Sequence, residues 1–241
     1  MKRAERQRLK QNDLGELTRQ VQDLVTERKR DIGWIALAVV VIGAVGLGYW
    51  AWHSREQGSA QKLLADAMVV QEARIGPPAA ATGATGLTFP TERERALAAV
   101  AKFKAAADAH PSTEAGLFAR YQEASTQMVL GNPAEAAKAY QAVIDRAGNS
   151  LYGQTARLGL AAAQARSGQF EQAITGYKEL AQRKEGGLPI DGILMELGRV
   201  YRDAGRASDA QQTFNRVVQE FPDSPFNADA KRELDALKKP A

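Results

Sequence analysis

The chain has 241 residues, of which 44% are hydrophobic and 25% charged, a balance typical of a folded protein with one or two domains. It contains no cysteine, which excludes disulfides, thiol catalysis and a lipid-modified cysteine anchor. Residues 1–31 carry nine Lys and Arg against six Asp and Glu, so only +1 of the total charge of +4 belongs to the remaining residues. Because nucleic-acid binding depends on clustered Lys and Arg, this near-neutral body disfavours a nucleic acid as partner.

A transmembrane helix is predicted at Ile32–Trp52, whose sequence IGWIALAVVVIGAVGLGYWAW contains no charged residue. At about 1.5 Å per residue this stretch spans roughly 31 Å, the thickness of the hydrocarbon core of a bilayer. The alternatives are the buried core helix of a soluble domain and a cleaved signal peptide, but a signal peptide has a shorter apolar stretch nearer the N-terminus. Aromatic residues at both ends are expected to anchor the helix among the lipid headgroups: Trp34, Tyr49, Trp50 and Trp52.

The basic juxtamembrane segment 1–31 predicts the orientation of this helix. Three consecutive basic residues, Arg28–Arg30, come just before it, whereas the first twenty residues after it contain only Arg55 and Lys62. Since positive charge is retained on the cytoplasmic side, the N-terminus is expected to be cytoplasmic and the longer C-terminal part to lie outside.

Four further segments are predicted after the apolar stretch. Residues 53–75 are expected to form a helix that leads into the folded domain, and 76–91 a flexible loop rich in Pro, Gly and Ala. Helical repeats follow over 92–222, and 223–241 are expected to form a polar capping helix and tail that begins with Ser224 as N-cap.

The region 92–222 repeats with a period of 37 residues. Four alanines, four aromatic residues and three glycines recur in one register, and they form the predicted repeat scaffold. These residues are Ala99, Phe103, Gly131, Ala136, Tyr140, Gly168, Ala173, Tyr177, Gly205, Ala210 and Phe214. Each glycine is expected to end a first helix in the left-handed conformation, each alanine to admit a neighbouring backbone, and each aromatic residue to fill the seam between units. Neither helix of a unit can bury its apolar stripe alone, so the units must stack.

The fourth unit, LMELGRVYRDAGRASDAQQTFNRVVQEFP, resembles a tetratricopeptide repeat. The positions that carry the resemblance are Leu197, Gly198, Tyr201, Gly205, Ala210, Phe214 and Pro222. The other units depart from the pattern at Gln127 and Gln164, where the family prefers tyrosine, and their period is longer than the 34 residues typical of the family. The expected fold is therefore all-α, with a single N-terminal transmembrane helix, an α-solenoid of about four repeats like those of tetratricopeptide proteins, and a capping helix.

The layout of the whole chain resembles a second family, the ancillary SecYEG translocon subunits. The resemblance rests on the aromatic cluster GYWAWH at the end of the apolar stretch and on repeats of the type AEAAKAYQAVI. It implies a single-span protein of the bacterial inner membrane with a periplasmic repeat domain, whose partners are translocon subunits, periplasmic chaperones or emerging client peptides. The C-terminal repeats are also similar to those of the cell division coordinator that works with the Tol-Pal system, and this similarity implies instead a scaffold for envelope assembly.

No constellation for catalysis, metal or cofactor binding is visible in the sequence, so an enzyme is not expected. The two histidines, His53 and His110, have no partners at the spacing that a zinc site or a catalytic triad needs.

A helical array instead offers a concave face, lined by its first helices, that holds a peptide or a partner helix. The register of the tetratricopeptide family places eight residues on this face: Tyr121, Ser125, Met128, Leu158, Arg166, Met195, Arg199 and Arg202. The alternatives are that these residues pack between helices or face water, and that the repeats self-associate into a homo-oligomer.

Overall fold

The computed structural model describes residues 29–77, 86–183 and 187–238. Contacts divide the chain into two units, Met1–Arg55 and Glu56–Ala241. Most of the predicted basic segment, residues 1–28, and part of the predicted loop, residues 78–85, lie outside the described residues, as do 184–186 and 239–241.

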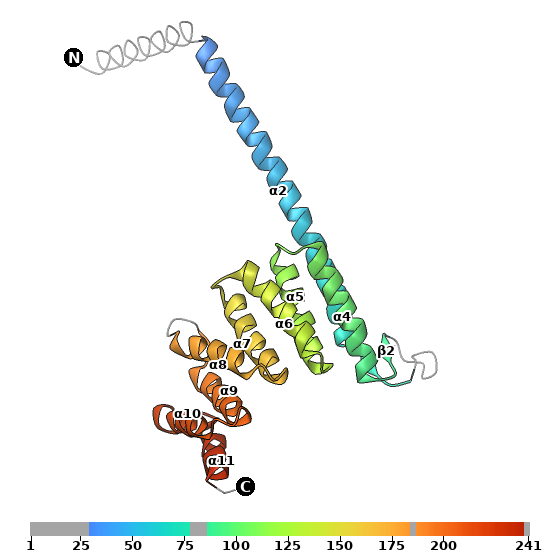
Figure 1. Cartoon of the computed structure of the whole chain (residues 1–241). Coiled ribbons are helices and arrows are strands. Elements are labelled where there is room, and N and C mark those ends of the chain that lie inside the picture. Colours follow the sequence, from blue (N-terminus) through green and yellow to red (C-terminus); the bar gives the residue numbers. More distant parts are fainter. Residues whose placement is uncertain (1–28, 78–85, 184–186, 239–241) are drawn as a thin grey trace, which may run out of the picture. The chain divides into compact units, whose positions relative to one another are not determined.

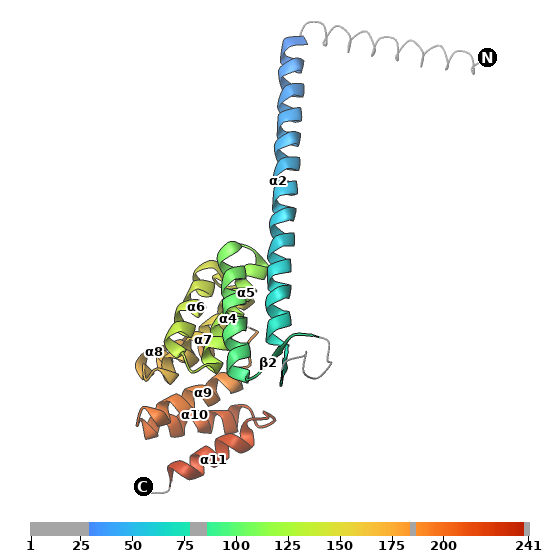
Figure 2. The same ribbon diagram turned by 90° about the vertical axis from the view of Figure 1, so that its right-hand side faces the viewer.

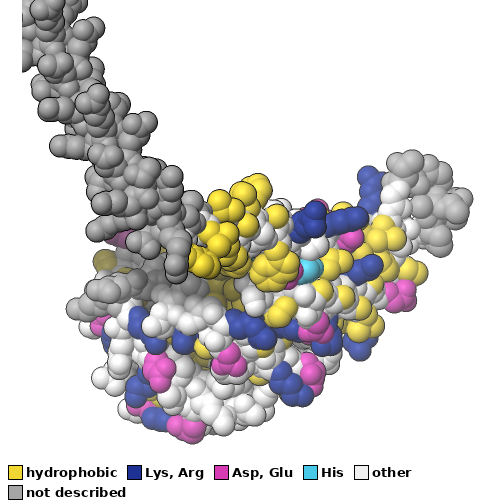
Figure 3. Space-filling view, turned by 90° about the horizontal axis from the view of Figure 1, so that it is seen from above, with side chains coloured by type: hydrophobic (Ala, Val, Ile, Leu, Met, Phe, Trp, Pro, Cys, Tyr) yellow, Lys and Arg dark blue, Asp and Glu magenta, His cyan; other side chains and the backbone are white. Residues whose placement is uncertain are grey.

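The first unit is described from helix α2 (Lys29–Gln71), which continues without interruption into the second unit. The apolar side chains of α2 are exposed, Ile42 to 71%, whereas the core helix of a soluble protein would bury them. Among the described residues, Leu37–Gln71 is the one helical stretch long and apolar enough to cross a membrane. Hydrophobic side chains gather in one patch of the face shown in the space-filling view (Figure 3).

The predicted anchor residues Trp34, Tyr49, Trp50 and Trp52 are all exposed on α2. The Tyr49 ring lies 6.1 Å from the Trp52 ring and stacks on the His53 ring at 5.8 Å. This part of α2 thus presents a compact aromatic surface beside the apolar stretch.

In the second unit, the end of α2 and eight further helices stack in pairs, one after another along the chain (Figures 1 and 2). The eight helices are α4 (Glu92–Ala109), α5 (Glu114–Val129), α6 (Pro133–Ala147), α7 (Leu151–Arg166), α8 (Phe170–Gln182), α9 (Ile190–Asp203), α10 (Ala207–Glu220) and α11 (Asn227–Leu237). The first helices of the four repeats are α2, α5, α7 and α9, and their second helices are α4, α6, α8 and α10.

The residues of the 37-residue register occupy equivalent places in the four repeats. The four register alanines are buried, and so are the four aromatic residues. Gly131, Gly168 and Gly205 adopt φ angles of 77°, 75° and 74°, the left-handed conformation expected after each first helix. Tyr140 reaches the next repeat, where a Cβ added at Gly159 would lie 2.4 Å from its ring, so this ring fills the seam as predicted.

The first repeat differs from the prediction at its loop. Helix α2 ends at Gln71, not at residue 75, and Arg74–Ile75 (β1) pairs in parallel with Thr88–Phe89 (β2). The Gly76 N–H donates to the Phe89 carbonyl oxygen at 2.9 Å and extends this pairing by one residue. Pro77 has no N–H and could not continue a helix. The loop is therefore closed at its base by a short strand pair.

The capping helix α11 begins at Asn227, so the prediction that Ser224 is its N-cap was wrong. The Ser224 hydroxyl accepts the Phe226 N–H at 3.0 Å and donates to Asp191 Oδ2 of α9 at 2.6 Å. Ser224 therefore closes a turn that ties the start of α11 to α9.

Candidate peptide-binding face

The candidate site is the face formed by the first helices α5, α7 and α9 together with the ends of α2 and α11, here called the first-helix face. Helix α5 contacts α7 and α7 contacts α9, whereas the second helices mainly contact their neighbours along the chain. The first helices therefore lie closer to one another than the second helices do, which places them on the inner side of the stack.

At the start of this face, Tyr121 is half-buried and meets the buried Tyr140 edge-on, with 5.5 Å between ring centroids. Burial and, to a smaller extent, the nearby Tyr121 raise the pKa of Tyr140 to about 12, although a hydrogen bond with Ser125 opposes the rise. Burial also raises the pKa of Tyr121. Both hydroxyls are therefore neutral at physiological pH and can donate to a carbonyl or a carboxylate.

Arg166 is exposed at the end of α7. Its Nη1 donates to the backbone oxygen of Met128 at 3.3 Å, which satisfies a carbonyl in the last turn of α5. Its positive charge also works against the rise that burial causes in the pKa of Tyr140 and of Tyr177. Arg166 thus provides an accessible cation near two neutral phenols, on a part of the face where Met128 is only partly buried.

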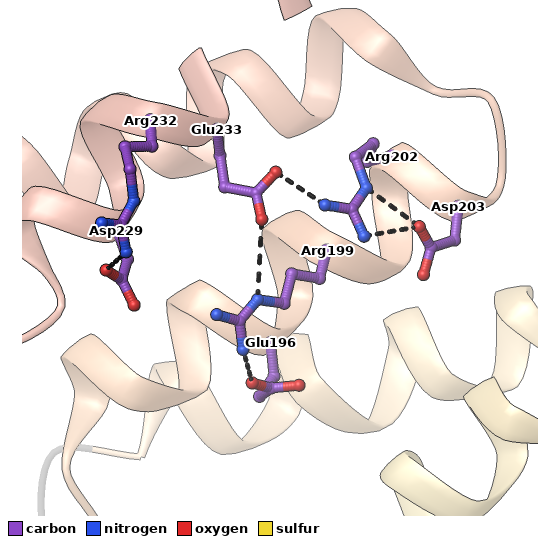
Figure 4. Close-up of polar contacts among 7 residues, drawn as sticks. All are labelled: Glu196, Arg199, Arg202, Asp203, Asp229, Arg232 and Glu233. Carbon is purple, nitrogen blue, oxygen red and sulfur yellow. Dashed lines mark hydrogen bonds and ion pairs between the residues drawn. The ribbon is translucent and has the colours of Figure 1, made fainter. Parts of the chain in front are cut away.

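Arg199 and Arg202 are already paired within the chain. Arg202 Nη1 lies 2.6 Å from Glu233 Oε2 of α11, and its Nε donates to Asp203 Oδ1 at 3.0 Å. Arg199 Nη1 donates to Glu196 Oε1 at 2.5 Å and its Nε lies 3.8 Å from Glu233 Oε1. Figure 4 shows Glu233 between the two guanidinium groups. The capping helix α11 thus supplies one carboxylate to both arginines.

Met195 does not line the face. It is 0% exposed in the C-terminal core, because α9 packs between α8 and α10 and its start lies against Phe226 in the turn before α11. A Cβ added at Gly192, one turn earlier, would lie 3.3 Å from the Phe226 ring. Leu158 is partly buried and packs against the same core. The residues that remain accessible on the face are therefore concentrated on α5 and at the end of α7.

Glu233 was missed in the sequence, although the repeat register contains it. Gln122, Gly159, Glu196 and Glu233 are spaced by 37 residues, which makes α11 the first helix of an incomplete fifth unit. At the other end of the array, the Gln122 side chain donates to Gln71 Oε1 of α2 at 3.4 Å. Polar side chains thus connect first helices across the face at both ends of the array.

A small cavity of about 130 Å³ opens between α2, α4 and α5. Gln71, Ser125, Thr126 and the exposed Val129 contribute to its lining. A cavity that holds a drug-sized ligand is several-fold larger. This one is suited to a single side chain of a bound peptide.

The described residues contain no cluster of three or more His, Asp or Glu side chains that could hold a metal ion. His110 instead joins two helices, with Nδ1 2.8 Å from Glu56 Oε1 and Nε2 3.1 Å from Ser59 Oγ. His110 therefore connects the end of α4 to α2.

Comparison with solved structures supports the helical-repeat fold. Two crystal structures of kinesin light chain nearly identical TPR-like repeats from Podosopora anserina, one of them of a variant with a single substitution, each match 61% of this chain with a TM-score of 0.53 and 16% identity. The matches cover 79% and 78% of those chains. No curated protein matches the sequence significantly.

Residues 30–239 match the model of the tetratricopeptide repeat-like domain, so the match includes the apolar stretch as well as all the repeats. The chain therefore belongs to the tetratricopeptide repeat-like domain family.

Proposed function

We propose that this protein is a membrane-tethered adaptor that binds other proteins with its first-helix face. The observation that carries the proposal is a single helix, α2, whose first part is apolar and exposed and whose end packs as the first helix of the repeats. Tetratricopeptide repeat folds are typically non-catalytic scaffolds for protein–protein interaction, which supports an adaptor.

The anchor is proposed to cross the bacterial inner membrane once, with the N-terminus in the cytoplasm and the repeats in the periplasm. The basic residues before the apolar stretch support this orientation. A reporter fused to the C-terminus tests it: alkaline phosphatase, which folds only outside the cytoplasm, should be active, and β-galactosidase should not. The reverse result would contradict the topology.

The partners proposed, from the resemblance of the layout, are translocon subunits, periplasmic chaperones or emerging client peptides. A tether confines the repeats to the neighbourhood of the membrane, so even weak contacts with a chain that emerges there benefit from a high effective concentration. The accessible part of the face combines apolar Met128 and Val129 with the cation Arg166, which suits an extended peptide bearing apolar side chains and a carboxylate.

Site-specific photocrosslinking in cells tests both the face and the partners. A photoreactive residue at Ser125 or Arg166 should crosslink to translocon subunits or chaperones. The same residue at Lys138 or Arg216, which lie on second helices, is the matched control and should not. Equal crosslinking from all four positions would refute the use of this face, and crosslinks only between copies of the chain would favour self-association.

A further inference from the structure

An exposed apolar pair lies at the start of α7, at the opposite end of that helix from Arg166. Leu151 is 63% exposed and Tyr152 38% exposed, and neither contributes to the hydrophobic cores of the described repeats. The Tyr152 ring contacts Phe118 of α5 edge-on, with 6.5 Å between centroids. The contact with Phe118 holds the Tyr152 ring in place. The Leu151 side chain projects into solvent beside the turn at 148–150 between α6 and α7.

Three arginines surround this turn. Arg157 Nη1 donates to the Gly148 carbonyl oxygen at 2.7 Å, and Arg183 Nη1 donates to Asn149 Oδ1 at 3.2 Å. Arg146, in the last turn of α6, donates to a backbone oxygen of the preceding turn.

None of these three arginines has a carboxylate within ion-pair distance among the described residues. Seven other arginines of the repeats do: Arg95, Arg120, Arg199, Arg202, Arg206, Arg216 and Arg232. The nearest acidic residue in sequence, Asp145, accepts instead from Gln141 Nε2 at 2.8 Å. Figure 3 shows charges of both signs on this end of the repeats. The turn therefore differs from the surrounding surface in having arginines without a carboxylate partner in the described part of the chain, and not in the net charge of the whole end.

The turn lies at the end of the repeats where α2 enters them. His110, in the turn before α5, bonds to Glu56 of α2, and α5 then runs away from that turn. Helix α6 returns to the same end, as the contact between Phe118 and Tyr152 requires. Glu56 follows Trp52 by four residues, so at most about 14 Å of chain separates Glu56 from the aromatic end of the apolar stretch.

We infer that the turn 148–152 docks on a lipid surface that carries anionic headgroups. Leucine and tyrosine side chains enter the interfacial region of a bilayer, and arginines beside them attract anionic lipids. The short reach to the apolar stretch favours lipid over a soluble acidic protein. Docking would attach the protein to the membrane at two places, through α2 and through the start of α7. This inference rests on the proposed membrane anchor.

The full-length chain in lipid vesicles tests this inference, and the absence of cysteine makes the labelling specific. A Leu151→Cys variant labelled with the environment-sensitive dye NBD should emit more strongly in vesicles of phosphatidylcholine and phosphatidylglycerol than in phosphatidylcholine alone. Spin-labelled lipid should quench this emission. The control is Val129→Cys, an equally exposed position at the far end of α5, whose dye should respond to neither lipid.

Charge variants then test the role of the arginines. Each Arg→Gln change at Arg146, Arg157 or Arg183 should lower the equilibrium constant for docking about five-fold, since each basic residue near an anionic surface contributes about that factor. Arg157→Lys should retain docking, which separates the charge from the hydrogen bond to the turn. Arg93→Gln, at the opposite end of α4, should have no effect.

The anchor and the docking contact fail in different ways. A chain that does not float with vesicles after alkaline extraction refutes the anchor, and the docking with it. A chain that floats, but whose dye at position 151 behaves like the dye at position 129, refutes the docking alone. A dye that responds to soluble polyglutamate and not to anionic lipid would overturn the lipid assignment in favour of an acidic polypeptide.

Discussion

Replacing Gly159 by alanine should destabilise the repeats, although alanine is the better helix former. Gly159 lies inside α7, and a Cβ at this position would approach Tyr140 Cζ to 2.4 Å and Cε1 to 2.5 Å. Carbon atoms in contact prefer about 3.5 to 4.0 Å, so the ring or the helix has to move by about 1 Å. Tyr140 is 4% exposed and Tyr121 meets its ring edge-on, so the ring has little room to move.

The size of the effect follows from two opposing contributions. Alanine in a helix interior stabilises by about 1 kcal/mol relative to glycine. Overpacking a filled core costs about 1 to 3 kcal/mol, and so short an approach to a confined ring belongs near the upper end. The free energy of unfolding should therefore fall by about 2 kcal/mol. Gly58→Ala in α2 is the matched control: nothing lies within 4 Å of its added Cβ, so it should gain about 1 kcal/mol.

Urea unfolding of the full-length chain in mild detergent, followed by far-ultraviolet circular dichroism, measures both variants. The double variant Gly159→Ala/Tyr140→Leu removes the ring atoms that clash, so in that background the alanine should stabilise the protein by about 1 kcal/mol, giving a coupling of about 3 kcal/mol. If Gly159→Ala stabilises the protein as Gly58→Ala does, the Tyr140 ring does not fill the seam between repeats and the reasoning is refuted.

Three further changes test the packing of the repeats by the same measurement. Arg120→Gln should lower the free energy of unfolding by about 2 kcal/mol or more, because it leaves the buried Glu123 carboxylate without its partner at 2.6 Å. The control Arg216→Gln breaks an exposed ion pair and should lower it by less than about 0.5 kcal/mol. The Arg120 guanidinium holds the pKa of Asp108 below its ordinary value of about 4, so the stability that this carboxylate contributes is present above about pH 4 and lost as the pH falls through the lowered value. Asp108→Asn should therefore flatten the acid side of the stability profile by a few tenths of a kcal/mol, since the pair is half exposed, and an unchanged profile would contradict this. Gly168→Ala should cost about 1 to 2 kcal/mol at φ 75° and Gly168→Asn less, and equal stability of both with the wild type would count against the left-handed turn.

The scaffold could be predicted from the sequence because its requirements are local or periodic. A glycine at positive φ and an alanine at a helix crossing are dictated by backbone geometry, so the 37-residue register was enough to find Gly168 and Ala173. The start of α11 could not be found in this way, since Ser224 bonds to Asp191, which is 33 residues away in sequence. A local N-cap pattern contains no information about such a partner.

On the candidate face, too, the sequence predicted what depends on the repeat register and missed what depends on neighbouring elements. The register placed Arg166 on an accessible surface, but it could not tell that Met195 is covered, because the cover comes from the neighbouring elements of the C-terminal end. Transfer of groove positions from one repeat to another assumes that every repeat has the same neighbours. The last repeat does not, because α11 follows it in place of a complete unit.

The pairing of Arg199 and Arg202 with Glu233 limits what the C-terminal half of the face can bind. Glu233 pairs with both Arg199 and Arg202 from within the chain, so a partner that reaches α9 must displace a charge-assisted hydrogen bond and an ion pair, or bring carboxylates that replace them. At the end of α7, Arg166 donates only to a backbone oxygen, and a carboxylate there meets a cation that no described acidic side chain pairs with. A peptide with one acidic residue is therefore expected to bind in the half of the face formed by α5 and α7. In the C-terminal half, the pairs with Glu233 connect α9 to α11 instead.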